Sequence, residues 1–124
     1  MMNRRACVAT IASTIALFGT VLLNEAAAQG ITVDQYRHPD TEKDLSFNKA
    51  YLTGIKDGLT AYNMSVEDKL FCLTGDLPFV TFEQANQVMM AWARKKGADV
   101  GGTSVNVALL HGLQERFPCR RSSQ

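Results

Sequence analysis

The stretch TFEQANQVMMAWARKKG, Thr81 to Gly97, decides the fold class, because every local signal in it is typical of an amphipathic helix. Thr81 and Gln84 form the S/T-x-x-E/Q pattern of a capping box. Basic residues crowd the last turn, where they complement the helix dipole, and Gly97 suits the left-handed position after a helix. Six apolar side chains share one face at helical spacing: Phe82, Ala85, Val88, Met89, Trp92 and Ala93. We therefore predict a helix over residues 81–96.

A second helix is expected over residues 44–63, capped by Asp44 or Ser46. Its apolar side chains are spaced by four, four, four and three residues: Phe47, Tyr51, Ile55, Leu59 and Tyr62. Gly54 and Gly58 lie on an adjoining line of this helix, where each glycine costs about 1 kcal/mol relative to alanine. Two glycines one turn apart favour close packing of another backbone, and a locally weak helix is the alternative. We expect a neighbouring helix to pack against them.

The third helix follows residues 97–102, a glycine-rich loop. It begins at Thr103 or Ser104 and ends at Phe117, before Pro118. Its apolar face comprises Val105, Ala108, Leu109, Gly112, Leu113 and Phe117. Since no segment shows the alternation of a strand, the sequence predicts an all-α fold, a small disulfide-bonded bundle of three main helices plus short helical turns.

The remaining segments are polar or lack a clear period. Residues 29–45 form an arm in which Thr32 can cap a short helical turn that ends at His38-Pro39. We expect this arm to be the least ordered part of the mature protein and the tail 120–124 to be disordered. The helical domain is placed at residues 46–119, with a connector at 64–80 between its first two helices.

Residues 1–28 have the composition of a secretory signal peptide. Arg4 and Arg5 precede an uncharged, largely apolar stretch, and Ala26-Ala27-Ala28 fits the small-residue cleavage rule, so the mature chain is expected to begin at Gln29. An uncleaved membrane anchor is the alternative, because about 18 apolar residues are close to the minimum for a transmembrane helix. Signal cleavage predicts a periplasmic protein without a membrane attachment.

Cysteine usage is consistent with export. Removal of the signal would take Cys7 with it and leave Cys72 and Cys119. Two thiols in an oxidising compartment predict one disulfide. Their spacing matches neither a zinc site nor a CxxC redox motif, so we expect a structural bridge and no metal.

Charge and motif content exclude several classes of function. Without Arg4, Arg5 and Glu25, the chain has eleven basic and eleven acidic residues, which argues against a nucleic-acid binder driven by bulk charge. His38 and His111 have no neighbouring catalytic motif, and we interpret both as structural. We predict a binding protein without enzymatic activity or cofactor.

The elements Tyr51-Leu52-Thr53-Gly54, Gly58-Leu59, Phe71-Cys72 and Arg116-Phe117-Pro118-Cys119 together resemble the Tai/Rap family over Ala50 to Cys119. Members of this family are immunity proteins against type VI secretion amidase effectors. The resemblance implies an all-α periplasmic domain, often dimeric, that blocks the cleft of a peptidoglycan amidase. It also implies that Cys72 and Cys119 form the bridge, and that Gly54 and Gly58 are closely packed. Many relatives have a further cysteine pair, with one cysteine just before the Tyr-x-x-Gly element. This pair is absent here, because Asn48, Lys49 and Ala50 occupy that region.

On this basis we expect the partner to be a cell-wall amidase, with a homodimer as a further assembly. The loop Gly97 to Gly102 is the candidate contact, helped by the connector Gly75 to Val80. Its residues Gly97, Gly101 and Gly102 permit close backbone approach, and Asp99 offers an acceptor. Two alternatives are a small periplasmic acid-stress chaperone and an accessory domain of an envelope complex.

Overall fold

The computed structural model describes residues 30–75, 77 and 79–120. Five helical elements follow one another in this part of the chain: α1 Val33–Arg37, α2 Glu42–Ser65, α3 Phe82–Lys96, the 3-10 helix η2 Ala98–Gly102, and α4 Val105–Arg116. An isolated antiparallel bridge between Thr32 and Ser104 is the only β-type pairing of the described residues. The prediction of an all-α bundle is confirmed. The segment 1–28, predicted as a signal peptide, and the tail beyond Arg120 lie outside the described residues.

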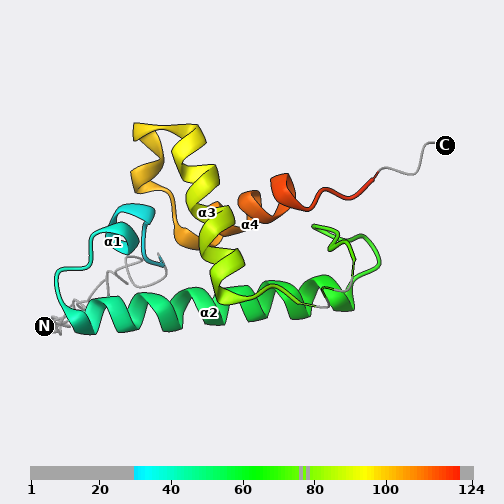
Figure 1. Cartoon of the computed structure of the whole chain (residues 1–124), viewed down its shortest axis with the longest axis horizontal. Helices are drawn as coiled ribbons and strands as arrows, with labels where there is room; N and C mark the ends of the chain where they lie inside the picture. Colours follow the sequence, from blue (N-terminus) through cyan, green and yellow to red (C-terminus); the bar gives the residue numbers. More distant parts are fainter. Residues whose placement is uncertain (1–29, 76, 78, 121–124) are drawn as a thin grey trace, which may run out of the picture.

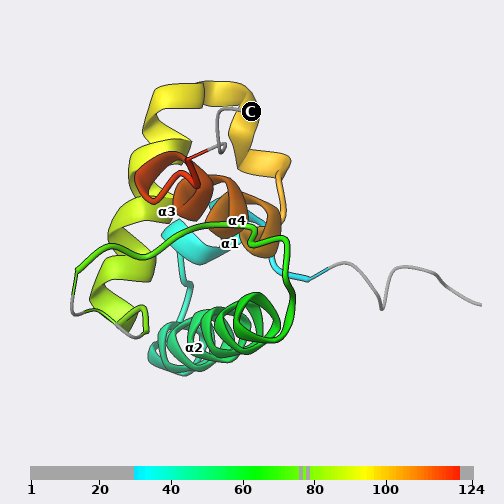
Figure 2. The ribbon, with the colours of Figure 1, turned by 90° about the vertical axis from the view of Figure 1, so that its right-hand side faces the viewer.

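The long helix α2 supports the other helices on one side (Figure 1). Figure 2 shows α2 nearly end-on, with α1, α3 and α4 all above it. The closest packing is between α3 and α4, and both also contact α2. The core lies between these three helices and contains the fully buried side chains Leu52, Phe71, Ala85, Met89, Leu109 and Leu113.

Helix α3 confirms its sequence prediction in detail. The Thr81 hydroxyl accepts from the backbone N–H of Gln84, and the Gln84 side chain accepts from the backbone N–H of Thr81. Gly97 follows the helix with a φ of 84°. The predicted apolar face is buried or partly buried along its whole length.

Helix α2 is longer than predicted, and three of the five predicted apolar side chains pack against the core: Tyr51, Ile55 and Leu59. It starts after Thr41, which forms a capping box with Asp44. Phe47 and Tyr62 remain 55% and 53% exposed, so their placement on the buried face is wrong. The buried residues of α2 are Asn48, Leu52 and Asn63. Two buried asparagines are tolerated because their side chains bond to nearby backbone groups.

The close packing expected at Gly54 and Gly58 is also wrong within this chain. Both glycines are exposed, and a Cβ built at either position has nothing within 4 Å. Close packing occurs instead at Gly112 of α4, where a Cβ would lie 2.6 Å from the carbonyl oxygen of Val88. The absence of a side chain at Gly112 therefore allows α4 to contact the backbone of α3.

The N-terminal arm is packed onto the domain rather than loosely ordered. Thr32 caps α1 as predicted, with Gln35 completing a capping box. Val33 is fully buried, and its N–H donates to Thr103 O at 2.9 Å. Val105 N–H donates to Ile31 O at 2.9 Å, which ties the arm to the start of α4. The domain therefore begins before residue 46.

Candidate functional site

The segment predicted as a flexible partner-binding loop, residues 97–102, contains the short helix η2. Val100 is 4% exposed, and Gly101 is buried against the carboxylate of Asp34. Gly101 is therefore inaccessible to a partner, and its assignment as a contact residue is wrong. Gly97, Asp99 and Gly102 are exposed at the surface of this compact turn.

Large apolar side chains are exposed mainly on α2 and on the connector that follows it. Among the described residues, those exposed by more than 40% are Leu45, Phe47, Tyr62, Met64, Leu77, Phe79 and Val107. All but Val107 belong to α2 or the connector. Figures 1 and 2 show the end of the connector returning beside α2 to the start of α3. We call the six side chains other than Val107 the α2–connector surface.

The connector is anchored at two points near this surface. Asn63 on α2 is 8% exposed, accepts from the N–H groups of Leu70 and Phe71 at 2.7 and 3.3 Å, and donates to Phe71 O at 2.9 Å. These bonds hold the chain where it leaves α2, and they place Phe71 in the core. Helix α2 itself ends at Ser65, so the connector begins directly after it.

The second anchor is the predicted disulfide between Cys72 and Cys119, which is confirmed. Cys72 N–H also donates to Phe117 O at 2.7 Å. The bridge thus joins the middle of the connector to the segment just after α4. In the chain-entropy model, closing a loop of this length stabilises the fold by about 4 kcal/mol.

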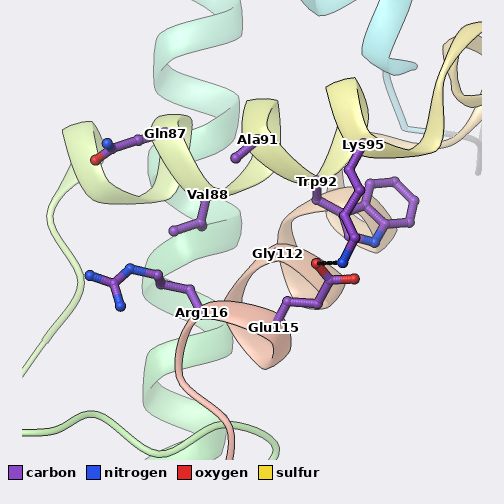
Figure 3. Close-up of a pocket in the computed structure, with 8 residues that line it drawn as sticks. All are labelled: Gln87, Val88, Ala91, Trp92, Lys95, Gly112, Glu115 and Arg116. Carbon is purple, nitrogen blue, oxygen red and sulfur yellow. Dashed lines mark hydrogen bonds and ion pairs between the residues drawn. The ribbon is translucent and has the colours of Figure 1, made fainter.

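A groove of about 310 Å³ lies between α3 and α4. Its apolar wall is formed by Val88, Ala91, Trp92 and Gly112. Polar side chains stand at its edges (Figure 3): Gln87, Lys95, Glu115 and Arg116. Lys95 Nζ and Glu115 Oε2 form an ion pair at 3.1 Å, which closes one end of the groove.

The aromatic contacts beside the groove involve His111, which we interpreted from the sequence as structural. His111 is exposed, and its ring stacks on Trp92 with centroids 5.4 Å apart and planes inclined by 14°. Lys96 Nζ lies 5.9 Å from the Trp92 ring centroid, within cation–π distance. His38, also exposed, directly follows α1.

Tyr36 is the titratable group most affected by its surroundings. Its hydroxyl donates to Asn86 Oδ1 at 2.8 Å and links α1 to α3. Burial raises the pKa of Tyr36 above its ordinary value of 10.0. The phenol therefore stays protonated at neutral pH and acts as a structural donor.

Metal sites and membrane spans are both absent from the part of the chain that the structure describes. No group of three or more His, Cys, Asp or Glu side chains in it is arranged to hold a metal ion. None of its helices combines the length and apolar character needed to span a bilayer. Comparisons with protein-family models, with curated proteins and with solved structures found no match to this chain.

Proposed function

We propose that this chain is an exported, non-enzymatic protein that binds another protein, and that it acts as an immunity protein by occluding a peptidoglycan amidase. The observation that carries the binding role is the α2–connector surface. Among the described residues, six of the seven most exposed large apolar side chains lie on α2 or the connector, and large apolar groups exposed on one part of a protein favour an interaction role. The choice of an amidase rests on the resemblance of the Tyr51–Gly58, Cys72 and Phe117–Cys119 elements to the Tai/Rap family.

The way the connector is held supports this role. An inhibitor gains affinity when its contact segment is fixed before binding, because less conformational entropy is then lost. Asn63 and the Cys72–Cys119 bridge restrain the connector at its start and middle. Phe79 is 58% exposed while its neighbour Val80 is 1% exposed, so a large aromatic side chain is presented from an anchored backbone.

The compact turn at residues 97–102 supplies a second contact in this proposal. Asp99 is exposed, and the burial of Val100 beside it fixes the turn to the core. A rigid protruding carboxylate can accept hydrogen bonds from donors in an amidase cleft. Asp99 therefore remains the contact proposed for this segment, without Gly101.

The test is co-expression in the periplasm of peptidoglycan amidases of the type VI effector class with the full chain. We expect wild type to prevent lysis by at least one amidase. Phe79→Asp should abolish protection, and Asp99→Lys should weaken it. Val107→Asp is the matched control, because Val107 is also exposed but lies on α4.

The possible outcomes distinguish a wrong choice of contact surface from a wrong choice of function. Lysis with folded Phe79→Asp and survival with Val107→Asp would support binding through the connector. Equal protection by all three variants would remove both proposed contacts. Lysis by every amidase in the presence of folded wild type would contradict the immunity role itself.

A further inference from the structure

The groove between α3 and α4 offers a binding site separate from the α2–connector surface. Its wall contains the two smallest residues of the groove lining, Gly112 and Ala91. Gly112 brings α4 against the backbone of Val88, and the short side chain of Ala91 leaves the space beside this contact unfilled (Figure 3). An apolar side chain entering this space would contact Val88 and Trp92.

The ends of the groove differ in charge. At one end, Lys95 and Glu115 neutralise each other. At the other, the guanidinium of Arg116 extends beyond the helix on the same side as Gln87 (Figure 3). Among the ion pairs formed by described residues, none includes Arg116, and its guanidinium carbon lies 5.5 Å from the ring of Phe117. Arg116 thus offers a positive charge and several donors next to an apolar wall.

The surroundings of the groove reinforce this positive character. The last turn of α3 contains Arg94, Lys95 and Lys96 and no acidic residue. Glu115 is the only acidic residue of the groove lining, and Lys95 already pairs with it. A positive, partly apolar groove favours a segment of the opposite charge, because complementary potentials steer association and fix its orientation.

We propose that this groove binds an acidic segment of a partner protein. One apolar side chain of the segment occupies the space between Ala91 and Gly112, and a neighbouring carboxylate pairs with Arg116, where a guanidinium can form two parallel hydrogen bonds. Gln87 stands beside the carboxylate as a second donor. The proposal does not depend on the partner being an amidase.

Binding in the groove can be followed by the intrinsic fluorescence of Trp92. Trp92 is the only tryptophan of the chain and lines the groove. Trp92 is 9% exposed, and a side chain that enters the groove would contact its ring next to the exposed His111 and Lys96, so binding changes the environment of the indole. Intrinsic fluorescence therefore reports binding without a label.

The experiment titrates the mature protein with two synthetic peptides, both acetylated and amidated. One alternates leucine with aspartate, and the other has asparagine in place of each aspartate. We expect a saturable change in Trp92 emission with the aspartate peptide and binding at least about tenfold weaker with the asparagine peptide. Arg116→Gln should weaken binding of the aspartate peptide about tenfold. Ala91→Leu, which fills the space with a good helix former, should abolish it.

Lys49→Gln is the matched control, because it removes an exposed positive charge from α2, outside the groove. It should leave peptide binding unchanged. Three results would each overturn the proposal. The two peptides could bind equally well, folded Arg116→Gln could bind the aspartate peptide as tightly as wild type, or Lys49→Gln could weaken binding as much as Arg116→Gln does. The absence of a saturable signal with wild type up to about 1 mM peptide would also overturn it.

Discussion

Replacement of glycines by alanine tests the packing of α3 against α4 most sharply. The substitution should lower the stability of the protein at Gly112 and raise it at Gly54 and Gly58. At Gly112 the new Cβ would lie 2.6 Å from the carbonyl oxygen of Val88, a backbone atom that cannot rotate away. The helices must separate by about 0.8 Å to restore the 3.4 Å of an ordinary contact. At Gly54 and Gly58 the new Cβ meets no atom within 4 Å.

The expected free energies follow from these contacts. Gly54→Ala and Gly58→Ala should each stabilise the protein by about 1 kcal/mol, since alanine has the higher helix propensity and no contact opposes it. Gly112→Ala has the same gain in propensity, but separating packed helices costs about 1–3 kcal/mol. Its net effect should be a destabilisation of up to about 2 kcal/mol. In a domain of this size, 1 kcal/mol corresponds to a shift in Tm of about 4–8 °C.

The assay is thermal unfolding of the mature protein, followed by far-UV circular dichroism with the disulfide intact. We expect Tm to rise for Gly54→Ala and Gly58→Ala and to fall for Gly112→Ala. A rise for Gly112→Ala as large as for Gly54→Ala would refute the close contact between α4 and Val88. A fall for Gly54→Ala or Gly58→Ala would mean that a second backbone does pack there, which a second copy of the chain would provide.

Three other predictions concern the anchors of the fold. Replacing Cys72 and Cys119 together by serine should lower the free energy of unfolding by about 4 kcal/mol, measured by urea denaturation, and native wild type should resist alkylation at both positions. Asn63→Ala should cost about 2–3 kcal/mol in the same assay, because two N–H groups of the connector lose their acceptor; an effect below about 0.5 kcal/mol would contradict the anchoring role. Wild-type stability should fall as the pH rises above 10. Burial raises the pKa of Tyr36 in the folded chain, so the unfolded chain releases the phenol proton at a lower pH than the folded chain does. Tyr36→Phe should remove that contribution and cost about 1 kcal/mol at pH 7, and an unchanged pH profile would count against burial of the phenol.

The sequence predicts helices well where every signal is local. The capping box of Thr81, the basic last turn and Gly97 all act within a few residues, and α3 forms with the predicted bounds. The short turn capped by Thr32 is predicted for the same reason. The Cys72–Cys119 bridge could also be predicted, because these are the only two cysteines after residue 28 of the sequence.

The orientation of α2 could not be predicted from apolar spacing alone. Phe47 and Tyr62 extend the apolar pattern but point away from the core, whereas Asn48 and Asn63 are buried. Asn48 donates to Gln35 O at 3.2 Å and Asn63 bonds to the connector, and both sets of partners come from other parts of the chain. Burial of a polar side chain depends on such partners, which a helical pattern does not contain.

The spacing of the glycines in the sequence also does not show which of them are closely packed. Gly54 and Gly58 attract attention because they are one turn apart, yet both are open to solvent in this chain. Gly112 stands alone on an apolar face, and only the position of Val88 on α3 shows that a side chain does not fit there. In the segment 97–102, the single large apolar residue, Val100, was the available signal that the turn packs against the core.

The proposal that most needs a test is that this protein binds and occludes a peptidoglycan amidase. The most direct measurement is the rate of peptidoglycan hydrolysis by purified amidases of the type VI effector class, each titrated with the mature protein. We expect at least one amidase to be inhibited stoichiometrically by wild type and by Val107→Asp, and we expect Phe79→Asp not to inhibit it. Undiminished hydrolysis by every amidase tested, in the presence of an excess of folded wild type, would contradict this proposal.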